Sequence, residues 1–408
     1  MRRRARCGLP RGGRENRRPH SIMERATTDR LPTVVAPLTF QQQWLWGTAE
    51  RQNTGIIGLR LLGDLDAQLL RRSFEIVIAR HGALRTRIVT FGAEPRQEID
   101  EPAGFHLQSI PFDGAFALEN AKNARRFIAS FFDAQTERTA GKLFEVRLLR
   151  LSARERVLVL TIRHIIADAF SIDILFRELW TLYSELVRGR LSPPRDPPVQ
   201  YADYALWQRE TAHAWVQKHS TYWQECLAQA VPAVFPVHPG PKGIERGDVA
   251  NEQINFGRQL SAAVRDLARR TRTLSAAIVM LAVYVAALSR WCGQKEFVLP
   301  FAVAGRHRPE HVEMIGFLSY YLYLPVKLTG DETFLELMSK VSRAFYTALE
   351  HQDFARMSAQ APELLLGPSF NWVPGALDSL VGVPEPSLQS QLAGHLEVEP
   401  FIDRKSVV

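Results

Sequence analysis

The spacing of apolar residues along the chain alternates between two periods, and each period predicts a different kind of element. Short, nearly continuous or alternating apolar runs predict strands at residues 54–63, 84–91, 143–151 and 156–164. Apolar residues at helical spacing predict helices at 64–82, 117–135, 171–189 and 201–229. We expect Asp64 or Asp66 to cap the 64–82 helix, and Ser171 or Asp173 to cap the 171–189 helix. The first half of the chain is therefore predicted to mix strands and helices.

The same two patterns recur in the second half. They predict helices at 261–271, 274–291 and 333–350, and strands near 250–256, at 296–305, at 317–328 and near 366–373. Two stretches rich in proline and glycine, 190–200 and 231–248, are predicted to be connectors. We expect an α/β (α+β) fold with an N-terminal lobe at 37–230 and a C-terminal lobe at 231–408, since 408 residues exceed one ordinary core.

The positive charge is concentrated at the N-terminus. The chain has a net charge of +8, and residues 1–30 carry ten arginines against three acidic residues, which leaves the remainder almost neutral. Residues 1–36 are therefore predicted to be a disordered, arginine-rich extension, and residues 1–22 to lie upstream of a true start at Met23. No nucleic-acid partner is expected, because such binders carry their positive charge on a folded face.

Other classes of protein are excluded by composition. The longest apolar run, 274–291, is interrupted by polar residues and predicts a buried helix, so no membrane association is expected. Three widely spaced cysteines suggest neither disulfides nor a zinc site, and a cytoplasmic location fits best. Phosphate-binding and metal-binding motifs are not found, so we expect no cofactor and no metal bound by this chain.

One short stretch carries candidate chemistry. An apolar run ends at His164, and Asp168 follows four positions later where a helix is predicted to begin. A neutral imidazole can accept a proton from an amine or alcohol as it attacks a thioester. A partly buried aspartate needs a cationic partner, such as an arginine elsewhere in the chain. The spacing alone is also compatible with a structural histidine.

Other segments favour the catalytic over the structural interpretation of His164, because they match the motifs of one family in the right order. The chain resembles the condensation domains of nonribosomal peptide synthetases, members of the chloramphenicol-acetyltransferase-like superfamily. The resemblance runs from about residue 37 to 400. Its motifs are PLTFQQQWLW (37–46), RHGALRTRI (80–88), RHIIADAFS (163–171, similar to HHxxxDGxS), YADYALWQ (201–208), the 302–326 segment (similar to IGxFVNT), HQDF (351–354) and FNWVP (370–374).

The resemblance implies two acetyltransferase-like lobes, each a sheet flanked by helices, that form a V with a tunnel between them. Substrates would arrive on the phosphopantetheine arms of carrier proteins. His164 would lie mid-tunnel, while Asp168 would be structural and paired with an arginine, for which Arg85 and Arg87 are the candidates. The final motif serine falls on Ser171. Trp207 falls on the tryptophan of the YxDYAxW motif and is expected to be a packing residue.

The chain also departs from the family pattern. Arg163 replaces the first histidine of the motif, and Ala169 replaces its glycine, where a methyl group would be strained if the backbone needed a positive φ. Tyr320 and Tyr321 replace an Asn-Thr pair. Family members continue beyond the equivalent of Val408, so a truncated C-terminal lobe is expected.

These observations predict a condensation-type acyltransferase. It would form an amide, or an ester, between a carrier-bound acyl thioester and an amine or alcohol, as a monomer working with carrier proteins and neighbouring synthetase domains. Two alternatives stay open. One is a catalytically degenerate domain that binds carriers or partner enzymes, and the other is a free-standing acyltransferase that uses coenzyme A thioesters.

Overall fold

A computed structural model describes most of the chain between residues 34 and 400. The described residues are 34–47, 54–92, 94–111, 143–190, 197, 199–228, 230–236, 254, 256–271, 275–352, 367–372, 392 and 396–400. The predicted 117–135 helix lies outside them, as do most of the 231–248 connector and most of the strand predicted near 250–256. Within this part of the chain, no helix combines the length and apolarity required to span a bilayer.

The first core is built on a five-stranded sheet. Its order is β10 (Leu396–Pro400), β2 (Thr54–Gly63), β7 (Glu155–Arg163), β6 (Phe144–Arg150) and β5 (Gln108–Pro111). Neighbours are antiparallel except for the β5–β6 pair. The central strand β7 is buried at six consecutive positions, which explains why its sequence is apolar at all of them except Thr161 rather than alternating.

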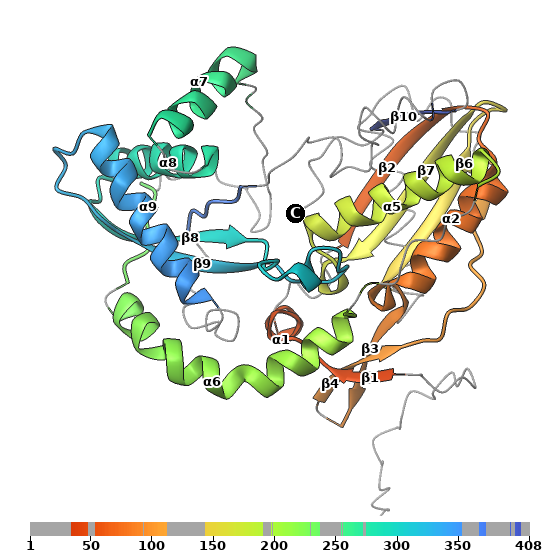
Figure 1. Ribbon diagram of the computed structural model, residues 1–408, viewed down its shortest axis with the longest axis horizontal. Helices are drawn as coiled ribbons and strands as arrows, with labels where there is room; N and C mark the ends of the chain where they lie inside the picture. The colour runs from red at the N-terminus through yellow and green to blue at the C-terminus, as the bar shows by residue number, and fades with distance from the viewer. Residues whose placement is uncertain are drawn as a thin grey trace, which may run out of the picture. The chain divides into compact units, whose positions relative to one another are not determined.

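Two helices, α2 (Ala67–Arg80) and α5 (Ala169–Val187), pack side by side along the five-stranded sheet (Figure 1). Both match predicted helices in type and approximate extent. Asp66 caps α2, as one of the two predicted candidates, by accepting hydrogen bonds from the backbone of Gln68 and Leu69. The buried face of α2 carries Leu70, Phe74 and Val77, at the spacing expected of an amphipathic helix.

A second, three-stranded sheet begins earlier than the sequence predicted. Its order is β1 (Val34–Pro37), β4 (Glu94–Ile99) and β3 (Thr86–Phe91), and all pairs are antiparallel. The prediction that disorder extends to residue 36 is therefore wrong, because Val34 to Ala36 pair with β4 and Ala36 is fully buried. Helix α1 (Phe40–Gly47) follows β1 directly.

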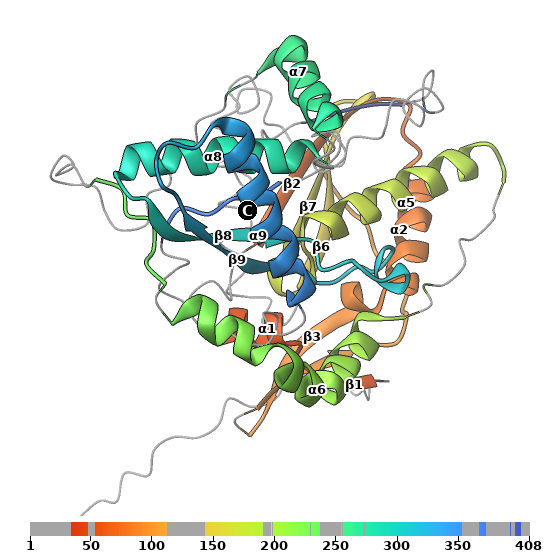
Figure 2. The same cartoon turned by 60° about the vertical axis from the view of Figure 1, so that its left-hand side comes forward.

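The second core is formed around a two-stranded antiparallel sheet. Strands β8 (Glu296–Val303) and β9 (Tyr320–Lys327) pair along their full length. Helix α9 (Phe334–Glu350) packs on β9 and on α8 (Ala276–Cys292), which in turn contacts α7 (Gly257–Arg270) (Figure 2). The strand predicted near 366–373 is represented, within residues 367–372, by a single bridge between Phe370 and Phe301.

The two cores are not separated by one cut in the sequence. The long helix α6 (Tyr201–Leu227) places Tyr201 in the first core and Trp223 in the second. Strand β10 and residues of the 304–319 segment, both assigned by sequence to the C-terminal lobe, belong to the first sheet and the first core. A single lobe boundary at residue 231 therefore does not separate the two cores, because segments that follow it in the sequence pack in the first core.

Candidate functional site

His164 lies at the carboxyl end of the central strand β7. It begins a single 3-10 turn, His164–Ile166, and its Nδ1 atom lies 2.7 Å from the carbonyl oxygen of Ala167. A carbonyl oxygen can only accept, so Nδ1 must carry the proton of this hydrogen bond. In the neutral ring, the lone pair is consequently on Nε2.

The imidazole of His164 lies beside the ring of Phe317. Its ring centroid lies 4.4 Å from that of Phe317, at an interplanar angle of 43°. The side chain is half-buried, and no hydrogen bond to Nε2 is present among the residues that the structure describes. A substrate proton would thus meet a nitrogen with an available lone pair.

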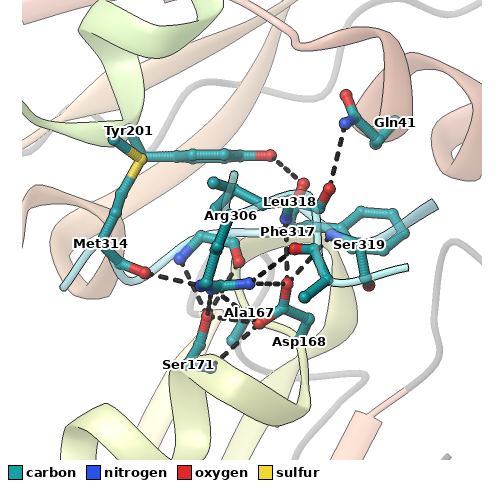
Figure 3. A network of polar contacts seen from close by, with 12 residues as sticks. Gln41, Ala167, Asp168, Ser171, Tyr201, Arg306, Met314, Phe317, Leu318 and Ser319 are labelled. Atoms are coloured by element: carbon teal, nitrogen blue, oxygen red, sulfur yellow. Dashed lines mark hydrogen bonds and ion pairs between the residues drawn. The ribbon is translucent and has the colours of Figure 1, made fainter. Parts of the chain in front are cut away.

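Asp168 occupies a different environment only four residues away. Its side chain is 2% exposed and pairs with Arg306, whose Nη1 and Nη2 atoms donate to the two carboxylate oxygens at 2.7 and 2.9 Å. The backbone N–H groups of Leu318 and Ser319 donate to Oδ2, and that of Ser171 donates to Oδ1. Figure 3 shows these contacts converging on the carboxylate. A buried charge is stable only when paired and hydrogen-bonded in this way.

The network keeps Asp168 ionised. Burial is the strongest influence and by itself raises the pKa of Asp168, but the charge of Arg306 and the hydrogen bonds from Arg306 and Ser171 together outweigh it. The pKa of Asp168 is therefore lowered from its ordinary value.

The prediction that Arg85 or Arg87 pairs with Asp168 is wrong. Arg85 donates instead to the backbone carbonyls of Ile78, Ala79 and Asp100, and Arg87 forms a two-pronged pair with the Asp100 carboxylate at 2.9 and 3.1 Å. Both arginines are therefore committed to β3 and its surroundings. The true partner, Arg306, comes from just beyond β8 in the second half of the chain.

The cap of helix α5 also differs from the prediction. Asp168, rather than Ser171 or Asp173, is the N-cap, and the helix begins at Ala169. Ala169 consequently has helical backbone geometry, so the strain expected if a glycine conformation were needed does not arise. Arg163, at the end of β7, is half-buried, and burial lowers its pKa. Tyr320 is buried in the second core and donates its hydroxyl to Gln352.

Ser171 connects the motif to the 304–319 segment. Its Oγ accepts hydrogen bonds from the backbone N–H of Gly316 and from Arg306. Its single hydroxyl proton can be donated either to Asp168 or to the carbonyl of Gly316, at 2.9 and 2.8 Å. The hydroxyl is therefore saturated and is not positioned as a nucleophile.

Two further side chains of the first core bind the same segment. Tyr201 donates its hydroxyl to the carbonyl of Phe317 at 2.8 Å, and Gln41 donates its amide to the carbonyl of Leu318. The segment passes so close to Tyr201 that a Cβ atom on Gly316 would lie 2.2 Å from the tyrosine ring. Gly305 has φ +69°, and its missing Cβ makes room for the carbonyl of Leu318.

Trp207 lies away from His164 in an aromatic cluster on α6. Its ring packs against Tyr204, Trp215 and His311, and Arg308 lies over its face at 4.5 Å. These are the surroundings of a packing residue. His311 is buried in this cluster.

Sequence reasoning missed Arg306, Tyr201 and Gly316. In the GRHRPEH stretch (305–311), the two histidines are the evident candidates for chemistry. The residue that contacts the motif is instead Arg306, which pairs with Asp168. Arg306 directly follows the strand predicted at 296–305, and two other arginines were available as candidates in the RHGALRTR stretch, so the sequence gave no sign of a contact 138 residues away.

Comparison with known proteins agrees with this geometry. The family model for the condensation domain matches residues 34–358. A linear gramicidin synthase from Brevibacillus parabrevis is 32% identical over 324 residues, which is 78% of this chain and 6% of that protein. The chain thus spans only a small part of that relative's length.

Two solved structures show the same fold. The first condensation domain of the CDA synthetase has a TM-score of 0.68 at 18% identity, covering 91% of this chain and 87% of that one. The X-domain from teicoplanin biosynthesis has a TM-score of 0.64 at 24% identity, covering 86% and 76%. The predicted α/β (α+β) fold class is confirmed, and the chain belongs to the condensation-domain family, as its ordered motifs indicated.

Proposed function

We propose that this chain catalyses acyl transfer from a carrier-bound thioester to an amine, forming an amide bond in the assembly of a peptide or related product. The observation that supports this most directly is the hydrogen bond from Nδ1 of His164 to Ala167, which leaves the Nε2 lone pair for a proton. The family match to the condensation domain and the likeness to a linear gramicidin synthase also support it.

The proposed step forms a C–N bond and breaks a C–S bond. The amine nitrogen attacks the thioester carbonyl while Nε2 of His164 accepts the proton that leaves this nitrogen, which gives the imidazolium. Collapse of the tetrahedral species expels the phosphopantetheine thiolate, which recovers a proton from the imidazolium. The thioester is already activated, so this chemistry requires no resident metal, nucleotide or redox cofactor.

Asp168 contributes in this proposal as scaffold and not as acid or base. Its two oxygens already accept six hydrogen bonds if Ser171 donates its hydroxyl proton to the carboxylate. Such a saturated carboxylate has no capacity to relay a proton. Its role is to fix helix α5 and the 304–319 segment around His164.

The natural partners in this proposal are carrier proteins that deliver both substrates. Ala169 lies in helix α5 and Tyr320 is buried in the second core, so neither residue by itself favours a degenerate domain, while Arg163 and Tyr321 still depart from the family motif. The docking domain and the coenzyme A-dependent enzyme remain as alternatives, and the same experiment distinguishes them.

The test compares the full chain with two histidine variants. Purified protein is mixed with an acyl-loaded carrier protein, or with the acyl-coenzyme A, and a panel of amines, and the amide is measured by mass spectrometry. We expect His164→Ala to lower the rate by about 100-fold or more, the usual contribution of a general base. His213→Ala, an exposed histidine on α6, should leave it unchanged.

Equal rates for wild type and His164→Ala would contradict the proposal. Carrier binding without turnover in either protein would favour a docking domain. Turnover with the coenzyme A thioester, but not with the loaded carrier, would favour the free-standing enzyme.

A further inference from the structure

The aromatic neighbour of His164 falls on a position that the family motif leaves open. In the alignment of IGFLSYY with IGxFVNT, Phe317 occupies the unspecified third position. Its ring nevertheless lies 4.4 Å from the imidazole of His164, and its side chain is buried in the first core with Ile165 and Ile166. A residue of the second half of the chain thus forms one wall of the histidine's environment.

The backbone on both sides of Phe317 is tied to the first core. The backbone N–H of Gly316 donates to the hydroxyl oxygen of Ser171 at 3.0 Å. The backbone carbonyl of Phe317 accepts a hydrogen bond from the hydroxyl of Tyr201 at 2.8 Å. Leu318 donates to the carboxylate of Asp168 at 3.1 Å. Three consecutive residues are therefore anchored through their backbone, and Figure 3 shows the contacts at Phe317 and Leu318. Because the phenyl ring is also buried, it has little freedom to move away from His164.

The imidazole itself has much less support. Its one hydrogen bond, to Ala167, restrains the Nδ1 atom but leaves the ring able to tilt about that contact. Terminal torsions of histidine are broad, so a single hydrogen bond does not define the plane of the ring. The ring of Phe317, tilted by 43° to the imidazole, supplies the second restraint, and two restraints determine where Nε2 points.

We propose that Phe317 is a positioning residue for His164: the Asp168–Arg306 scaffold holds Phe317, and Phe317 holds the imidazole in the orientation that presents Nε2. This explains how Asp168 can influence His164 without contacting it. The consequence for catalysis rests on the proposed function, whereas the effect on the histidine ring does not.

The structural test uses protein labelled with 15N in histidine. Long-range 1H–15N spectra distinguish the tautomers, and the His164 signals are identified by their loss in His164→Ala. Wild type should show one tautomer protonated at Nδ1. Phe317→Ala should keep this tautomer but show line broadening or shifted ring signals at His164 alone, whereas Phe317→Leu, which retains much of the apolar contact, should remain close to wild type.

A matched control removes a ring elsewhere. Phe345→Ala deletes a phenyl group that packs on Phe301 in the second core, and it should not change the His164 signals. If Phe317→Ala does not fold, Phe317→Val carries the same test. A His164 spectrum in the folded variant that is identical to wild type would overturn the proposal.

The kinetic test separates a positioning role from a loss of binding. Phe317→Ala should lower kcat by about 10-fold to 100-fold with little change in KM, because a small displacement of a catalytic group costs that much. Phe317→Leu should recover most of the rate. An unchanged kcat together with a disordered His164 ring would overturn the catalytic part, and absence of turnover in wild type would instead contradict the proposed function.

Discussion

At the scale of single residues, the loop between β7 and α5 holds two titratable groups in opposite situations. Asp168 uses both oxygens to bind Arg306, Ser171 and the backbone, and it has no lone pair directed at solvent. His164 uses one nitrogen and leaves the other available. The sequence predicted the separate roles of base and scaffold, but not the arginine, because pattern and spacing carry no information on a contact 138 residues away.

The depressed pKa of Asp168 makes a pH-dependent prediction. We compare urea unfolding of wild type with that of Asp168→Asn, which should cost about 3–5 kcal/mol at pH 7 because it leaves Arg306 unpaired. The ordinary pKa of aspartate is 3.8, and the folded value is lower. The wild-type advantage should therefore be complete above pH 3.8 and should shrink as the pH falls through the folded pKa.

A surface aspartate on the same helix provides the control. Asp173 forms a longer, partly exposed pair with Arg177 at 3.5 Å, and Asp173→Asn should change the stability by less than about 1 kcal/mol. A contrary result would be a difference in unfolding free energy between wild type and Asp168→Asn that stays constant as the pH falls below 3.8. That result would show that folding does not stabilise the ionised form of Asp168.

At the scale of elements, the strongly periodic segments were predicted well and the short strands were not. The 54–63 strand and the helix beginning at Tyr201 coincide with β2 and α6. Strands β1, β4, β5 and β10 were missed, and each contains proline and no more than six residues. Such strands are stabilised by their pairing partners, so their own sequence has little propensity to detect.

The 304–319 segment makes a prediction about close packing. Gly316→Ala would place a methyl group against the ring of Tyr201, so we expect a loss of about 1–3 kcal/mol or more in unfolding free energy, the usual cost of overpacking. Gly104→Ala, where a Cβ atom meets nothing within 4 Å, should stay within about 0.5 kcal/mol of wild type. Equal stabilities for both variants would mean that the segment does not lie against α6 as described.

At the scale of the whole described chain, the two cores share segments instead of dividing the sequence at one point. The first sheet takes β10 from residues 396–400, and the first core takes Met314, Ile315, Phe317 and Leu318. Composition and element order predicted two halves of similar kind, and the described residues form two hydrophobic cores, one on a five-stranded and one on a two-stranded sheet. Long-range packing decides to which core each residue belongs. The pattern of apolar residues along the sequence carries no information on this choice.

Strand β10 provides a test at this scale. A chain ending at residue 395 loses the buried side chains of Leu396 and Val398 and exposes the edge of β2 (Figure 1). Each side chain is worth about 1.5–3 kcal/mol, so unfolding should occur at clearly lower urea concentration. A chain ending at Pro400 keeps the strand and should match the full chain. If both truncations behave alike, β10 does not stabilise the sheet.

The return of late residues to the early core also bears on biosynthesis. During translation, the first two hundred residues emerge without the strand and the loop that complete their sheet and their buried polar network. They cannot reach their final packing until about a hundred more residues have left the ribosome, and the outer strand arrives later still. If the gene is divided within the connector predicted at residues 231–248, the two fragments, produced separately, should therefore regain native structure only when they are mixed.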